Sequence, residues 1–112
     1  MSDASRQYQK YITGADEGMV YNVNGVKFDG YKDGVLLEAK GIYSNFVNKS
    51  GEFYEWFTGS EGLVNQARRQ IAAADGMAVK WFFNDVVSLE ATKKLLLKEG
   101  ISGIELVLDI MP

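Results

Sequence analysis

Apolar residues recur along the chain with two different periods, and the change of period marks the expected elements. Around Asp33-Gly34, apolar and polar residues alternate with a period of two over residues 26–40, and this dipeptide is a strong signal for a two-residue turn. The run Met19–Val23 has the same extended character and is followed by a second turn signal, Asn24-Gly25. The pattern predicts a three-stranded meander over residues 19–40.

Helix and strand patterns alternate over the rest of the chain. The expected elements are helices over residues 5–13, 59–75 and 85–99 and strands over residues 77–83 and 104–110. Thr58 and Glu61 have the spacing of a capping box at the start of the second helix. Together these elements predict an α+β fold, an α/β sandwich with an N-terminal helix, a three-stranded meander and then helix-strand-helix-strand.

Opposed acidic residues on the hairpin are the first candidate for chemistry. A two-residue turn places Asp29 directly across from Glu38 and puts both on one face with Lys40, while Phe28, Leu37 and other apolar residues share the opposite face. Like charges directly opposed across two strands are destabilising. A divalent cation between the two carboxylates would remove this cost, because Mg²⁺ is usually held by one or two carboxylates with water and phosphate.

A solvated charge ladder is the alternative explanation for the same residues. In that arrangement Lys27 and Lys40 neutralise Asp29 and Glu38 on an exposed face, and such surface pairs contribute little to stability. The alternation of residues alone leaves both interpretations open.

Composition restricts the chemistry more than the size of the chain does. The 112 residues are expected to form one domain, residues 1–112, and 46% hydrophobic with 24% charged residues is ordinary for a soluble globular protein. With no cysteine and no histidine, thiolate and imidazole ligands and histidine bases are excluded. Asp, Glu, Lys, Tyr and backbone oxygens remain, which restricts metals to hard cations such as Mg²⁺, Mn²⁺ or Ca²⁺.

The charge and the ends of the chain bear on its partners. A net charge of −3 weighs against nucleic acid as a partner, but a local basic patch matters more than the sum, and metal-holding carboxylates are neutralised in use. No run of about 18 apolar residues is present, so no membrane partner is expected. The first residues lack the apolar region of a signal peptide, so export would require a larger parent protein or a secretion machine.

Two further groups of residues have both a functional and a structural interpretation. The connection 42–59 is rich in aromatic residues, which form either a flap that contacts bases or, as we prefer, a satellite core. Gln66 and Gln70 lie four apart on one shoulder of the second helix. They either overlook the carboxylates or are neutral residues at the boundary of the core.

The order of these residues resembles a known signature. Asp29, followed after eight residues by Glu38-Ala39-Lys40, is similar to the Asp…Glu-x-Lys motif of restriction-endonuclease-like nucleases. The surrounding residues resemble the restriction-endonuclease-fold toxin domains found at the C-termini of large secreted bacterial proteins, including type VI secretion effectors. Further matching segments are Tyr8-Gln9, Ile12-Thr13-Gly14, Gln66, Gln70, Trp81 and residues 100–104. The resemblance therefore extends over nearly the whole chain and implies a restriction-endonuclease-like mixed sheet.

The resemblance also implies roles for individual residues. Asp29 and Glu38, with the backbone carbonyl of Ala39, would hold one Mg²⁺ or Mn²⁺, and Lys40 would orient a water molecule or stabilise the developing oxyanion. Gln66 and Gln70 would steady the water or the substrate, which completes the catalytic set implied by the motif. Glu17 would be either an additional acidic ligand or a solvated loop residue.

The resemblance also implies a biological role, that of a metal-dependent nuclease acting as an antibacterial toxin. Its substrate would be nucleic acid, with DNA favoured over RNA, and it would act in the cytoplasm of a target bacterial cell after secretion or injection. A cognate immunity protein is the expected partner, besides the larger secreted parent or secretion machinery. The alternatives are an inactive nuclease-like binding module and a toxin of the same fold with a target other than nucleic acid.

Overall fold

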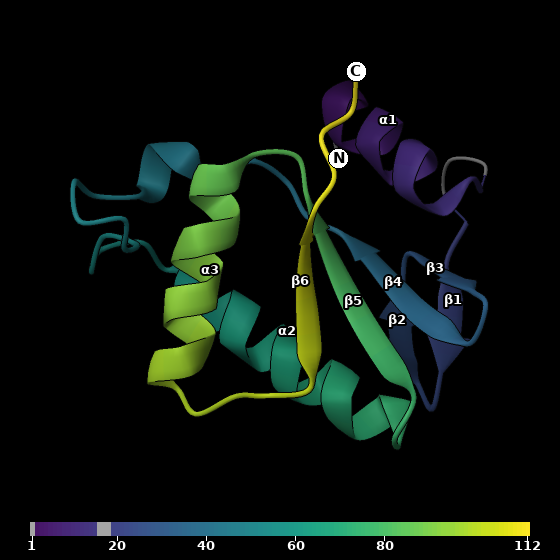
Figure 1. Cartoon of the computed structure of the whole chain (residues 1–112). Helices are drawn as coiled ribbons and strands as arrows, with labels where there is room; N and C mark the ends of the chain where they lie inside the picture. Colours follow the sequence, from purple (N-terminus) through teal and green to yellow (C-terminus); the bar gives the residue numbers. More distant parts are fainter. Residues whose placement is uncertain (1, 16–18) are drawn as a thin grey trace.

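The computed structural model describes residues 2–15 and 19–112, and within them it confirms the predicted α+β class (Figure 1). The helices are α1 (Asp3–Thr13), α2 (Gly59–Ala74) and α3 (Val86–Lys98), with a short 3-10 helix, η1 (Ser44–Phe46). The strands are β1 (Tyr21–Val23), β2 (Val26–Phe28), β3 (Gly30–Lys32), β4 (Val35–Ala39), β5 (Ala78–Phe83) and β6 (Ile104–Leu108). All three predicted helices are present, within two residues of their expected bounds.

The four-stranded sheet has the order β3-β4-β5-β6. Strands β3 and β4 are antiparallel, whereas β4, β5 and β6 are parallel because α2 and α3 return the chain between them. Helices α2 and α3 pack against the sheet, and α1 contacts β3 and β4 (Figure 1). Parallel strands end at the same edge of the sheet, so the residues that follow β4 and β5 lie next to each other.

The main core lies between the sheet and the helices α2 and α3. Its buried members are Phe28, Leu36, Leu63, Ala67, Ala74, Val79, Trp81, Phe83, Leu89 and Leu96. Each large apolar side chain buried there stabilises the fold by about 1.5–3 kcal/mol. Side chains alternate along β4, so Glu38 and Lys40 lie on the same face as Leu36, the face that α2 covers.

The hairpin between β3 and β4 has the predicted register, with Lys32 opposite Val35 and Gly30 opposite Leu37. At Asp29 the regular hydrogen-bond ladder between the two strands is interrupted. Leu37 is already the partner of Gly30, yet the N–H of Asp29 donates to the Leu37 carbonyl oxygen at 3.0 Å. Asp29 and Gly30 thus both face Leu37, which is the arrangement of a β-bulge, with one extra residue in one strand.

This bulge modifies the predicted meander. The middle strand is interrupted at Asp29, so β2 pairs with β1 in a separate two-stranded sheet and only β3 pairs with β4. The extra residue also shifts the alternation of side chains by one. Phe28 therefore packs in the main core with Leu36, and its predicted placement on the same face as Leu37 is wrong.

Two smaller predictions about the ends of elements are also wrong. Thr58 has the helical angles φ −68° and ψ −20° and makes no side-chain cap, because an N-cap residue needs an extended backbone to turn its hydroxyl toward the helix. The last strand was predicted to reach residue 110 but ends at Leu108, and Ile110 is 60% exposed. There the chain leaves the sheet, since the Tyr8 hydroxyl donates to the carbonyl oxygen of Asp109 and the Tyr11 hydroxyl to its carboxylate.

The aromatic connection between β4 and α2 forms a satellite core, as preferred from the sequence. The rings of Phe46 and Phe57 stack at 4.4 Å, and Phe53 lies 5.2 Å from Phe57 and edge-on to Tyr43. Trp56 lies at the edge of this cluster, stacked on Tyr54 at 5.2 Å, with 64% of its surface exposed. Among the described residues, no helix is long and apolar enough to cross a membrane.

Candidate active site

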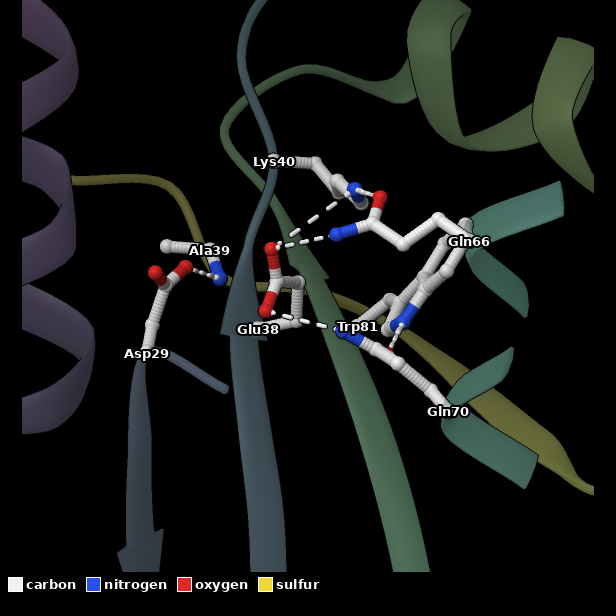
Figure 2. Close-up of polar contacts among 7 residues, drawn as sticks. All are labelled: Asp29, Glu38, Ala39, Lys40, Gln66, Gln70 and Trp81. Atoms are coloured by element: carbon white, nitrogen blue, oxygen red, sulfur yellow. Dashed lines mark hydrogen bonds and ion pairs between the residues drawn. The ribbon is translucent and has the colours of Figure 1, made fainter. Parts of the chain in front are cut away.

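Glu38 lies near the end of β4 with only 9% of its surface exposed. Its two carboxylate oxygens accept hydrogen bonds from two side chains of α2: Gln66 Nε2 donates to Oε2 at 2.9 Å, and Gln70 Nε2 donates to Oε1 at 3.1 Å (Figure 2). Residues four apart lie on the same face of a helix, so one helix supplies both donors. This arrangement fixes the plane of the carboxylate.

Lys40 is 5% exposed and lies on the same face as Glu38. Its Nζ is 3.8 Å from Glu38 Oε2 and donates a hydrogen bond to Gln66 Oε1 (Figure 2). The backbone N–H of Lys40 donates to the carbonyl oxygen of Phe82 at 2.8 Å, which extends the pairing of β4 with β5 past the last residue of the strand. The direction of the lysine side chain therefore follows from the regular sheet.

Trp81 completes the buried network from β5, where it lies opposite Glu38. Its indole Nε1–H donates to Gln70 Oε1 at 2.7 Å, and Lys40 Nζ lies 4.2 Å from the centre of its ring (Figure 2). Trp81 matches the family signature, but no role was predicted for it from the sequence. Buried indole N–H groups usually find a partner, which was the available signal, but the pairing with Glu38 depends on a parallel register that the sequence does not reveal.

The prediction that Asp29 lies directly across from Glu38 and shares its face is wrong, because the bulge puts Asp29 opposite Leu37, beside the edge of β4. Its Oδ2 accepts a hydrogen bond from the backbone N–H of Ala39 at 2.8 Å, where a regular antiparallel partner would offer a carbonyl oxygen. In Figure 2 its carboxylate lies on one side of β4, and Glu38, Lys40 and the two glutamines lie on the other. Asp29 therefore reaches the same end of β4 as Glu38 but from the adjacent segment.

The three ionisable groups influence one another. The pKa of Glu38 is raised to about 7, chiefly by burial; Lys40 and the two glutamines lower it, and the charge of Asp29 adds to the rise. Burial also raises the pKa of Asp29, against the hydrogen bond from Ala39 and the charge of Lys40. Burial lowers the pKa of Lys40, although both carboxylates oppose this shift. A nearby cation would stabilise the ionised forms of these two carboxylates, of which Glu38 is buried and Asp29 half-buried.

The donor set fits a hard divalent cation. The described residues contain no group of three or more His, Cys, Asp or Glu side chains that could hold a metal, so the acidic ligands would be Asp29 and Glu38 alone. Each oxygen of Glu38 has a second lone pair besides the one engaged by a glutamine. Two carboxylates with water and substrate oxygens are a usual set for Mg²⁺. Glu17, the additional ligand considered from the sequence, lies outside the described residues.

The structure contradicts the solvated charge ladder. Glu38 and Lys40 are buried, and Lys27 lies opposite Asn22 in the separate two-stranded sheet, away from Lys40 in the register. Gln66 and Gln70 contact Glu38 directly and are not neutral boundary residues. The catalytic roles of these residues and the metal-binding role of the Ala39 carbonyl stay predictions.

A mixed sheet with an Asp…Glu-x-Lys group at the end of its hairpin defines a restriction-endonuclease-like domain. The family model described as restriction endonuclease fold toxin 5 matches residues 5–85, a span that contains the whole network from Asp29 to Trp81. The chain belongs to this family, which supports a nuclease-like toxin. A search of the curated proteins finds no match.

Proposed function

We propose that this domain is a metal-dependent nuclease that hydrolyses phosphodiester bonds, with DNA favoured over RNA as its substrate. One observation carries the proposal: the acid and the lysine of the Glu-x-Lys motif are held together in a buried network, with Nζ 3.8 Å from Oε2. Burying such a pair is costly unless its partners are well placed, and replacing it with apolar residues would often give a more stable protein. A chemical role explains why the pair is there.

Each residue of the site would have a role that follows from its chemistry. Mg²⁺ or Mn²⁺, held by Asp29, Glu38 and the backbone carbonyl of Ala39, would lower the pKa of a bound water and stabilise charge on the phosphate. Lys40 would supply a compact positive charge for the attacking water or the developing oxyanion. Gln66 accepts from Lys40 and donates to Glu38, so it would keep the lysine and the carboxylate in a fixed relation.

Gln70 and the pKa shifts support the same proposal. Gln70 donates to the second oxygen of Glu38, so neither oxygen can turn away without losing a hydrogen bond. Burial raises the pKa of both Glu38 and Asp29, so a cation bound near them would favour their ionised forms. Binding of the cation would therefore release protons and complete the negatively charged ligand set.

The biological setting is part of the proposal. Membership in a toxin family supports an antibacterial toxin domain, carried by a larger secreted parent protein or a secretion machine into the cytoplasm of a target cell. A nuclease of this kind endangers the cell that makes it, so a cognate immunity protein is the expected partner.

Incubation of the purified domain with plasmid DNA and with total RNA, in Mg²⁺, Mn²⁺ or EDTA, tests the proposed activity. We expect cleavage that requires the metal and falls about 100-fold or more in Asp29→Ala and Lys40→Ala, since removing one electrostatic stabiliser of a transition state costs about 10²–10³ in rate. Glu90→Ala and Lys10→Ala, exposed residues on α3 and α1, are matched controls that retain full activity.

Two results would contradict the proposal. Cleavage that persists in EDTA, or that survives both site substitutions, would remove the mechanism. Toxicity that depends on Lys40 without cleavage of either nucleic acid would indicate another target, an alternative with which the net charge of −3 is compatible.

A further inference from the structure

Trp81 touches two members of the site with two different parts of its side chain. The edge of the indole donates Nε1–H to Gln70 Oε1 at 2.7 Å, and its face lies 4.2 Å from Lys40 Nζ (Figure 2). Trp81 and Gln70 are both completely buried, with exposed fractions of 0%. Water therefore cannot replace either contact.

The edge contact decides which way the Gln70 amide points. A glutamine amide can turn by half a revolution and exchange its oxygen and nitrogen, and the choice follows from its partners. The indole N–H can only donate, so it keeps the oxygen of Gln70 toward itself and the NH₂ group toward Glu38. The reversed amide would set N–H against N–H at Trp81 and oxygen against carboxylate at Glu38, leaving buried polar groups unpaired.

The face contact acts on the other half of the network. An ammonium over an indole ring is attracted by the negative charge of the ring face. This contact holds Lys40 where it can donate to Gln66, and Lys40 then fixes the Gln66 amide as the indole fixes that of Gln70. Both hydrogen bonds to Glu38 therefore depend on Trp81. The indole N–H orients the Gln70 amide, and the ring face orients the Gln66 amide through Lys40.

We infer that Trp81 is the positioning residue of this site: its edge orients Gln70, its face holds Lys40, and both actions converge on Glu38. The inference deepens the proposed function and rests on it for its effect on catalysis. Trp81 has no contact with either predicted acidic ligand among the hydrogen bonds and ion pairs of the described residues, so it acts only through its neighbours.

Two substitutions separate the edge from the face. Trp81→Phe keeps an aromatic face under Lys40 and removes the donor, whereas Trp81→Leu removes both. Side-chain amide signals in ¹H–¹⁵N spectra report the result without any substrate, and Trp56→Phe assigns the indole signals because the chain has two tryptophans. We expect Trp81→Phe to shift the signals of Gln70 and leave those of Gln66, and Trp81→Leu to shift both pairs.

Kinetics test the consequence for catalysis. Loss of a residue that orients a ligand costs about 10- to 100-fold in activity or metal affinity, so Trp81→Phe should lower kcat by about 10-fold with little change in KM. Gln70→Met removes the amide through which the edge acts. In the Gln70→Met background, Trp81→Phe should cost less than about 2-fold more, because residues that act as one unit are not additive.

The double variant Gln70→Met with Trp81→Phe also tests the alternative that Trp81 only stabilises the fold. Gln70→Met leaves the buried indole N–H without an acceptor, and adding Trp81→Phe removes that unpaired donor, so Trp81→Phe should cost less Tm in the Gln70→Met background than in the wild type. Tm values from thermal unfolding measure this. Additive losses in kcat and in Tm would overturn the positioning role.

The outcomes also separate this inference from the proposed function. A wild-type protein that cleaves nothing but shows the expected amide shifts would overturn the nuclease and leave the positioning role standing. An active wild type whose Gln70 signals and kcat are unchanged by Trp81→Phe would overturn the positioning role and leave the nuclease standing.

Discussion

The two carboxylates of the site are held in contrasting ways on the two sides of β4. Both oxygens of Glu38 are occupied by glutamine amides inside a buried network, whereas the hydrogen bond to Asp29 comes from the backbone of Ala39 to one oxygen. Beyond Ala39, on the side of α1, lies a cavity of about 260 Å³ whose lining includes Ala39, Lys40 and Tyr8. Glu38 is thus held at both oxygens and Asp29 at one, and neither carboxylate is among the residues that line this cavity.

This contrast separates the expected consequences of substitution. Changes on the Glu38 side should disturb folding and catalysis together, because the buried polar groups there are one another's hydrogen-bond partners. Changes at Asp29 should act mainly on the cation, since Asp29 contributes charge without supporting the core.

The largest effect is expected at Gln70. Gln70→Ala would leave the Trp81 indole N–H and one oxygen of Glu38 unpaired and would open a cavity at a completely buried position. We expect a loss of about 3 kcal/mol in the free energy of unfolding, from unsatisfied groups and lost packing together. Urea unfolding in EDTA measures it. Arg69→Ala, on the exposed side of the same helix, is the control, and an equal loss there would contradict the account.

Metal binding gives the next effect. A cation that binds only the folded state at 100 times its Kd raises the free energy of unfolding by about 2.7 kcal/mol. We expect Mn²⁺ to raise Tm in the wild type and in Arg69→Ala, and Asp29→Asn to abolish the gain while the protein stays folded. An undiminished gain in Asp29→Asn would show that the cation binds elsewhere.

The pH dependence of stability comes third. The pKa of Glu38 is about 7 in the folded protein, above its ordinary value of 4.5, so between these values the folded state binds more protons than the unfolded state. The free energy of unfolding must then fall as pH rises through this window. Asp29, whose pKa is also raised, adds in the same direction.

Urea unfolding in EDTA at pH 5 and pH 8 tests this sign. Glu38→Gln cannot ionise, so its stability should change less between the two pH values than that of the wild type. A wild type that gains stability over this range relative to Glu38→Gln would contradict the raised pKa.

The smallest effect is expected for Asp29→Asn without metal. The raised pKa of Asp29 shows that its ionised form is disfavoured in the fold, so a neutral side chain of the same shape should change stability by less than about 1 kcal/mol. Urea unfolding in EDTA provides the value. A loss as large as that of Gln70→Ala would remove the distinction between the two sides of β4.

Local signals in the sequence account for most of the fold. Asp33 and Gly34 both adopt positive φ, 53° and 82°, as a two-residue hairpin turn requires, and this turn alone determines the register of β3 and β4. Glu38 and Lys40 follow from that register by simple alternation. The family signature then adds Gln66 and Gln70, which helical spacing puts on one face.

Gly30 was a sequence signal for the bulge at Asp29, but the regular alternation of apolar and polar residues favoured an uninterrupted strand. A glycine inside a strand pattern indicates a bulge or a close backbone approach, and a Cβ on Gly30 would lie 2.9 Å from Cγ2 of Thr13 in α1. The pairing of Trp81 with Glu38 had no local signal. It depends on the parallel pairing of β4 with β5, which brings together residues 43 positions apart only after α2 has folded between them.

The most direct measurement of the central claim is the site of Mn²⁺ binding. Substoichiometric Mn²⁺ broadens NMR signals near the ion, so the backbone amide of Ala39 and the side-chain amides of Gln66 and Gln70 should broaden first, while signals of the exposed face of α3 stay sharp. Asp29→Asn should abolish this pattern. Broadening that begins elsewhere, or that is unchanged in Asp29→Asn, would contradict a single cation held between Asp29 and Glu38.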